Sequence, residues 1–203
     1  MAFNIQDFRS SLRYDGARPN LFEVSMSTIN VGVANIDPQM VFKCRAAQLP
    51  EDNLGVIPVN YMGREIKIPG NRTFPEWTVT VINDEDFLVR NSLEQWMSGI
   101  NSHVRNLRNP AYQSNSGENG KTYTCDATVT QFGKDGSPIK KYTFVGCWPT
   151  NVSAIDLDWS ANDQVEEFQI TFAYQWWESV PFTDTTGSGA PSSALNATGA
   201  RIR

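Results

Sequence analysis

Gly146–Glu178, with the sequence GCWPTNVSAIDLDWSANDQVEEFQITFAYQWWE, is the stretch that decides the fold. Residues 165–177 alternate apolar and polar side chains, which is the pattern of a half-buried β-strand. Residues 152–159 are predicted to form a preceding strand, joined to it by a turn at 160–163. The longer strand would place Phe168, Ile170, Phe172, Tyr174 and Trp176 on one face, and Glu167, Gln169, Thr171, Ala173 and Gln175 on the other.

The same stretch contains six acidic residues and no Lys or Arg, and no basic residue occurs between Lys141 and Arg201. The whole chain of 203 residues has a formal net charge of −5. A sheet face or edge built from this stretch is therefore predicted to be anionic. That excludes binding of nucleic acid by the usual neutralisation of phosphates.

The rest of the chain supplies more strands. Alternation is also seen at 20–26, 41–47, 77–82 and 140–147, and most clearly at 122–131. That strand would direct Tyr123, Cys125, Ala127 and Val129 to one side, and Thr122, Thr124, Asp126, Thr128 and Thr130 to the other.

One helix is predicted at about residues 84–100. Asn83 or Asp84 could cap it, and the acids that follow suit the positive end of the helix dipole. Apolar residues at helical spacing would pack one face on a sheet: Val89, Leu93, Trp96 and Ile100. Together these elements predict a mainly β fold of about seven strands, a two-sheet β-sandwich or partly open β-barrel with one flanking α-helix.

Residues 49–73 stand out because Pro and Gly interrupt them, yet two β-patterned halves flank Gly63-Arg64. They are predicted to form a long hairpin-like excursion. One interpretation is a solvated surface loop. The other is a projecting arm that docks on another subunit, because six of its side chains are too apolar for a solvated loop: Ile57, Val59, Tyr61, Met62, Ile66 and Ile68.

The chain is predicted to comprise one β domain, residues 1–178, and a C-terminal tail, residues 179–203. The tail is rich in Ser, Thr, Gly, Ala and Pro and is expected to be flexible. No segment resembles a signal peptide or a membrane span, so we expect synthesis and retention in a cytoplasm without a membrane anchor. The three cysteines lack the spacing of a disulfide framework or a zinc site.

Sequence motifs for chemistry are scarce. The single histidine, His103, lies in a polar segment. Asp156 and Asp158 could imitate a carboxylate pair, but glycosidase carboxylates face each other across a cleft. No phosphate loop, nucleophile elbow or metal-ligand spacing is present. The prediction is a protein that is not an enzyme and has no metal or cofactor.

The polar faces of residues 122–131 and 165–177 allow two interpretations. They could be ordinary solvated sheet faces, or they could line an aqueous channel. In the second case hydroxyl groups and a few carboxylates would hydrate the wall and repel phosphate.

Several blocks of the sequence, in order and spacing, resemble the tail tube proteins of contractile-tailed, T4-like bacteriophages. They span about residues 17–178: ARPNLFEV at 17–24, Leu49-Pro50 with 57–59, GNRTFPEWTVTV at 70–81 followed by 83–85, and Gly146–Glu178 with its WPTNV and LDW motifs. Residues 27–39, 102–121 and those after Glu178 depart from the family pattern, so contacts there cannot be transferred.

The resemblance implies a structural virion protein, assembled in the host cytoplasm, that forms six-fold rings stacked into the inner tube of a contractile tail. Double-stranded DNA would pass through without specific binding. The implied partners are further copies of the chain, the tail sheath protein, baseplate and tail-terminator proteins, and a tape-measure protein in the lumen. The resulting hypothesis for the lumen wall is Thr122, Thr124, Asp126, Thr128, Thr130, Glu167, Gln169 and Thr171.

Two other interpretations stay open. A tube initiator of the baseplate, or the tube protein of a related contractile injection or secretion system, would share the same fold. A carbohydrate-binding β-sandwich would instead display clustered exposed aromatics, for which Trp148, Trp159, Trp176 and Trp177 are candidates. Because most of these lie on apolar strand faces, burial in the core or an interface is favoured.

Overall fold

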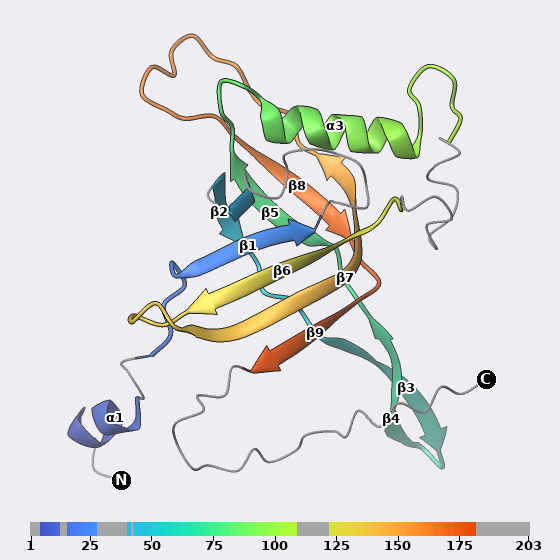
Figure 1. Cartoon of the computed structure of the whole chain (residues 1–203). Coiled ribbons are helices and arrows are strands. Elements are labelled where there is room, and N and C mark those ends of the chain that lie inside the picture. Colours follow the sequence, from blue (N-terminus) through green and yellow to red (C-terminus); the bar gives the residue numbers. More distant parts are fainter. Residues whose placement is uncertain (1–4, 13–15, 28–39, 42, 109–121, 182–203) are drawn as a thin grey trace.

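A computed structural model of the chain describes residues 5–12, 16–27, 40–41, 43–108 and 122–181. Within them lie nine strands and the helices α1 and α3 (Figure 1). Their bounds are α1 Ile5–Ser11, β1 Phe22–Ser27, β2 Cys44–Ala47, β3 Asn53–Tyr61, β4 Arg64–Thr73, β5 Trp77–Ile82, α3 Leu88–Ile100, β6 Cys125–Phe132, β7 Pro138–Val152, β8 Glu167–Ala173 and β9 Trp176–Pro181.

Two antiparallel sheets share the long strand β7. The first half of β7 pairs with β6 and β9, and β1 extends that layer, which we call the first sheet. The second half of β7 pairs with β8, and β5 and β2 follow in the layer that we call the second sheet. The predicted fold of two β-sheets with a flanking helix is thus confirmed.

The two sheets meet at a corner where the chain crosses twice. Gly146 has φ +68°, and a Cβ at that position would lie 3.0 Å from Cγ of Gln175. The Gln175 amide donates to the Val145 carbonyl at 3.0 Å. This corner interrupts the strand predicted at 165–177, which is in fact β8 and β9, one in each sheet. Glycine suits Gly146 because other residues rarely adopt a left-handed backbone conformation.

The core lies between the inner faces of the sheets, where alternate residues of the strands meet. Val24, Val129 and Phe144 come from the first sheet, and Phe168 and Ile170 come from the second. All five are at most 2% exposed. The alternation that predicted the strands therefore also identified their buried faces.

Helix α3 covers one open end of the sandwich (Figure 1) and buries Val89, Leu93 and Trp96, as predicted. The predicted cap is wrong. The helix starts at Leu88, and its N-cap is Phe87 in a left-handed conformation, without a side-chain cap. Asn83 is instead held by Glu166, and the carboxylate of Asp84 accepts a hydrogen bond from Lys43 at 2.6 Å.

Two predicted strands have different bounds. Residues 153–166 contain no strand, so the strand predicted at 152–159 is wrong beyond Val152. The strand predicted at 122–131 starts only at Cys125, and before it the Thr122 hydroxyl donates to the Thr124 carbonyl at 2.7 Å. Thr122 and Thr124 therefore precede the sheet.

The excursion at 49–73 is a two-stranded ribbon, β3–β4, with its turn at Met62-Gly63. It forms a sheet of its own that projects from the sandwich (Figure 1). At the C-terminus, β9 continues to Pro181. Residues 182–203 of the predicted tail, and residues 28–39 and 109–121 of the predicted loops, lie outside the described residues.

Candidate assembly surfaces

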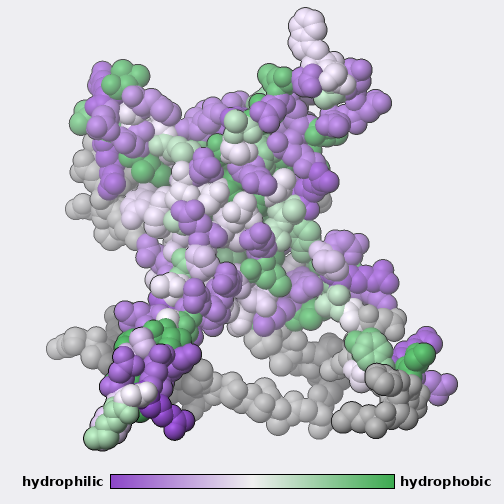
Figure 2. All heavy atoms as spheres, turned by 180° about the vertical axis from the view of Figure 1, so that it is seen from behind, coloured by the Kyte–Doolittle hydropathy of each residue, from purple (hydrophilic) through white to green (hydrophobic). Residues whose placement is uncertain are grey.

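The ribbon β3–β4 has an apolar face that nothing in the described structure covers. Cross-strand pairs Ile57–Ile68 and Val59–Ile66 set its register, and Tyr61 continues the same face toward the turn. These side chains are 42–62% exposed, and Met62 at the turn is 89% exposed. Apolar residues are visible along the projecting ribbon in Figure 2.

The opposite face of the ribbon is different in composition. It mixes polar and apolar residues: Val56, Pro58, Asn60, Glu65, Lys67 and Pro69. Arg64 lies opposite Tyr61, at the end of the apolar face. An isolated two-stranded ribbon is at best marginally stable in water. A ribbon with one consistently apolar, exposed face has the composition of a docking element.

The predicted lumen residues fall on two separate faces. Thr128 and Thr130 lie on the outward face of the first sheet, where the Thr128 hydroxyl shares a 2.7 Å hydrogen bond with Ser25. Asp126 also points outward, and it accepts a hydrogen bond from the Gly146 amide at 3.0 Å. Asp126 therefore helps to hold the corner between the sheets.

Glu167, Gln169 and Thr171 lie on the outward face of the second sheet. Register places them opposite Ile82, Thr80 and Thr78 of β5, in that order, which extends the hydroxyl-rich face across a neighbouring strand. Arg45 of β2 also reaches this face, where its guanidinium donates to the Glu167 carboxylate. The predicted lumen residues of β6 therefore share one face of the first sheet, and those of β8 share one face of the second sheet. The structure does not bring these two groups onto one surface.

A third surface was missed by the sequence reasoning. The loop 153–166 encloses, with Arg45 and Glu167, an open hollow of about 600 Å³. Three apolar side chains of this loop are strongly exposed: Leu157 at 81%, Trp159 at 101% and Val165 at 67%. In the sequence, Leu157 and Trp159 alternate with polar residues, and this spacing of two predicts a strand rather than an exposed loop.

The hollow has an acidic lining. Asp156, Asp158, Glu166 and Glu167 contribute four carboxylates, and Arg45 is the one basic residue among its lining residues. The Ser160 amide donates to Asp158 at 2.9 Å and, with the Ser160 side chain, lowers the pKa of that carboxyl. Asp158 therefore stays ionised at neutral pH.

The candidates for chemistry do not form a catalytic arrangement among the described residues. Burial raises the pKa of the Cys44 and Cys147 thiols to about 12 each, so both are protonated at neutral pH. His103 is exposed. The described residues contain no cluster of three or more His, Cys, Asp or Glu able to hold a metal ion, and no described helix could span a membrane.

The aromatic residues do not gather on one exposed face. Trp148 and Trp177 are half-buried and pack against the core. Trp159 and Trp176 are exposed, but Trp159 lies in the loop 153–166 and Trp176 at the start of β9. Among the described residues, these tryptophans form no aromatic platform of the kind that a carbohydrate-binding module would present.

Comparison with known proteins identifies the family. A family model described as phage tail tube protein matches residues 17–180. The tail tube proteins gp19 of Enterobacteria phages T4 and T6 are each 36% identical over 167 residues, covering 81% of this chain and 92% of theirs. A chain in the baseplate of the anti-feeding prophage has the same fold, with a TM-score of 0.59, 12% identity and coverage of 82% of this chain and 96% of that chain. The chain therefore belongs to the phage tail tube protein family, and with it to the structural proteins of the virion tail.

Proposed function

We propose that copies of this chain assemble into six-fold rings that stack as the inner tube of a contractile tail, the conduit through which genomic DNA leaves the virion. The observation that carries the proposal is the unpartnered apolar face of the ribbon β3–β4. Five side chains exposed on one side of a projecting ribbon need a covering surface, and in a homopolymer another copy supplies it.

Open sheet edges support ring closure. β1 and β9 are the outer strands of the first sheet, and each has one unpaired edge among the described strands. An exposed edge invites pairing with another chain, and closure into a ring removes it. A contact between unlike edges is heterologous, so it closes a ring when the rotation between copies is a simple fraction of a turn.

The outward face of the second sheet is our candidate for the lumen wall. It carries Gln169, Thr171 and the threonines of β5, and the Arg45 charge on it is already paired with Glu167. Unpaired cations would bind phosphates and slow a moving DNA. On the outward face of the first sheet, the β9 edge suits an interface better, because Trp176 and Val180 are 46% and 52% exposed there.

The same assembly defines the proposed partners. The outer surface of the tube would contact the tail sheath protein, its ends would contact baseplate and tail-terminator proteins, and a tape-measure protein would occupy the lumen before DNA. An initiator of the baseplate would share this fold but cap only one end. We propose the tube subunit rather than the initiator because the 36% identical relatives are named tail tube proteins.

Electron microscopy of the purified protein tests the proposal. We expect rings at low concentration and tubes of uniform width at high concentration. A baseplate initiator would give single rings that do not elongate. A chain that remains monomeric at all concentrations would contradict the proposed assembly.

Two lysines added to the candidate lumen face should make the tube bind DNA. The double substitution Gln169→Lys with Thr171→Lys places 12 extra positive charges in each six-fold ring. We expect assembled tubes to retain double-stranded DNA, with a retention that falls steeply as salt rises. The measurement is co-sedimentation of tubes with short duplexes over a salt series.

The matched control is Thr128→Lys with Thr130→Lys, which adds the same charge to the outward face of the first sheet. DNA retained inside should resist nuclease, whereas DNA bound to the outside should be digested. Nuclease resistance for the control pair and not for the test pair would assign the lumen to the first sheet instead.

A further inference from the structure

The ribbon β3–β4 and the loop 153–166 lie at opposite ends of the second sheet. β5 pairs with β8 such that Trp77 lies opposite Phe172 and Ile82 lies opposite Glu167. The ribbon connects to the Trp77 end of β5, and the loop connects to the Glu167 end of β8. At about 3.4 Å per residue, five residues separate the two ends by roughly 17 Å along the strands.

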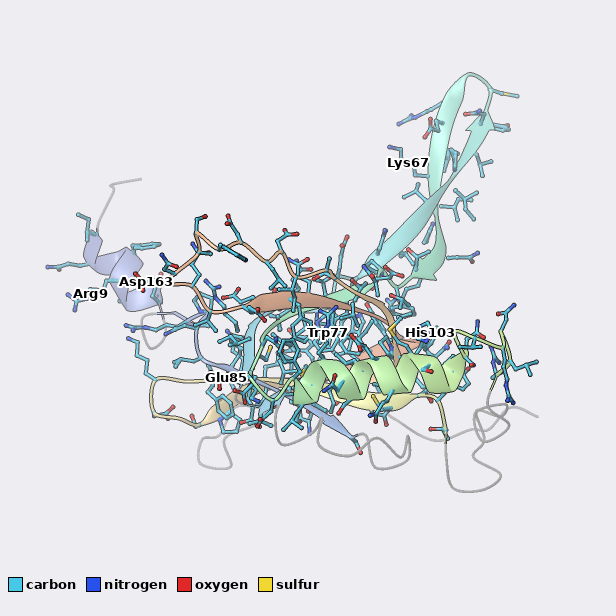
Figure 3. The ribbon with its side chains drawn as sticks, turned by 90° about the horizontal axis from the view of Figure 1, so that it is seen from above. Arg9, Lys67, Trp77, Glu85, His103 and Asp163 are labelled. Atoms are coloured by element: carbon cyan, nitrogen blue, oxygen red, sulfur yellow. The ribbon has the colours of Figure 1, made fainter. Side chains whose placement is uncertain are left out.

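The pictures agree with this register. In Figure 1 the ribbon leaves at the lower right and the loop lies at the upper left. In Figure 3 Lys67 of the ribbon and Asp163 of the loop lie on opposite sides of the molecule. A contact between ribbon and loop therefore has to form between two copies, and it joins the head of one to the tail of the next.

The two surfaces are complementary in polarity. Each has exposed apolar side chains: Ile57, Val59 and Tyr61 on the ribbon, and Leu157 and Trp159 on the loop. Burying such side chains is worth roughly 25 cal/mol for each Å² removed from water, so both surfaces gain by covering each other.

The two surfaces are also complementary in charge. Residues 53–73 contain three basic residues, Arg64, Lys67 and Arg72, and one acid, Glu65, for a net charge of +2. Residues 153–166 contain four acids and no basic residue, for a net charge of −4. Within the described part of the chain Arg64 and Lys67 have no ion-pair partner, whereas Arg72 is paired with Asp52 at 3.3 Å.

We propose that the ribbon β3–β4 of one copy docks on the loop 153–166 of a copy in the next ring, with its apolar face against Leu157 and Trp159 and with Arg64, which lies opposite Tyr61 on that face, at the acidic hollow. This contact rests on the proposed stacking of rings and names the surface that receives the ribbon. It is heterologous and does not close on itself, so it repeats from ring to ring and permits a tube of any length.

Charge reversal on each side, and then on both, tests the contact. The ribbon variant Arg64→Glu and the loop variant Asp156→Lys should each form rings but require at least about a threefold higher concentration to form tubes. Combining both substitutions restores opposite charges and the original net charge, so tube formation should return toward the wild-type concentration. The measurement is the critical concentration for tubes by sedimentation and electron microscopy.

A matched control changes the same net charge elsewhere. Glu94→Lys alters one exposed acid of α3, outside the loop and the ribbon. Combined with the ribbon variant it should fail to restore tubes. Rescue by this control as good as rescue by the loop variant would show a general charge effect and would overturn the contact.

The outcomes also separate this contact from the proposed function. If the ribbon variant impairs tubes while the loop variant does not, the ribbon docks on another surface and this inference is wrong, although ring stacking stands. If neither variant changes tube formation, and the double variant Met62→Cys with Ala161→Cys forms no disulfide-linked ladder, the contact is absent. If the wild-type protein forms no rings or tubes, the proposed function itself fails.

Discussion

Replacing Trp77 with alanine is expected to lower the free energy of unfolding by about 4 kcal/mol, within the range for large aromatic residues in protein cores. Trp77 is 2% exposed and connects the two sheets. Its ring stacks on Phe144 of the first sheet at 4.4 Å between centroids and lies 5.6 Å from Phe172 of the second. Its indole N–H donates to the Gln48 carbonyl at 2.8 Å, so the substitution also leaves that acceptor without its partner.

The measurement is chemical denaturation of unassembled protein, because assembly would add its own stabilisation. A loss of this size should also reduce the midpoint of thermal unfolding by roughly 8–16 °C for a chain of this length. Trp159→Ala is the matched control, since the same side chain at 101% exposure should change stability by no more than about 0.5 kcal/mol. Equal losses at both positions would contradict the assignment of Trp77 to the core.

Much of the sandwich could be predicted because its signal is local and repeated. In β5, β6 and β8 each alternate side chain is buried, so period-2 patterning marks both the strand and its inner face. The spacing of Val89, Leu93 and Trp96 likewise marked the buried side of α3. These signals are local because a half-buried strand or helix has apolar residues at its own period, whichever elements pack against it.

The corner between the sheets could not be predicted because it depends on residues far apart in sequence. Gly146 approaches Gln175, and Asp126 accepts a hydrogen bond from the Gly146 amide. Alternation continues through Tyr174 and Trp176, so nothing local marks the crossing from β8 to β9. The predicted helix cap was wrong for a related reason. The side chains of Asn83 and Asp84 form hydrogen bonds with Glu166 and Lys43, which are far away in sequence, and not with the N-terminus of the helix.

The predicted strand at 152–159 was wrong for a reason that bears on function. Its apolar residues at every second position suggested a buried face, yet Leu157 and Trp159 are exposed in the single chain. The Ser153 amide donates to the Gln169 carbonyl at 2.8 Å, and after that contact the loop leaves the sheet. In one sequence, alternation of side chains that stay exposed in the single chain cannot be distinguished from alternation produced by a core.

The candidate contact residues of the ribbon, which stay a prediction, rest on the same principle. Apolar side chains at 57, 59, 61, 66 and 68 imply a covering surface, and the structure places all five on one exposed face. What the sequence could not supply is the position of that face relative to the rest of the molecule. The register of β5 and β8 supplies it, because it separates the ribbon from the loop by the length of a sheet.

Two acids on the apolar face of the ribbon are expected to abolish tubes at concentrations where the wild-type protein polymerises. Ile57→Asp with Ile68→Asp alters a cross-strand pair that is 52% and 46% exposed in the single chain. Full burial of an isoleucine is worth roughly 1.5–3 kcal/mol, and about half of that is still to be gained at each position on assembly. Losing both contributions should raise the critical concentration for tubes at least about tenfold. Folding should be preserved, because both side chains contact solvent before assembly.

The control for this last variant uses the other face of the same ribbon. Pro58→Asp with Asn60→Asp adds the same charge on the side that already carries Glu65 and Lys67, and it should form tubes near the wild-type concentration. Critical concentrations come from sedimentation, and circular dichroism verifies that all variants are folded. If both variants lose tubes equally, the ribbon responds to charge and not to the loss of an apolar contact. If Ile57→Asp with Ile68→Asp polymerises normally, the apolar face is no contact between copies, because two buried carboxylates could not be tolerated there.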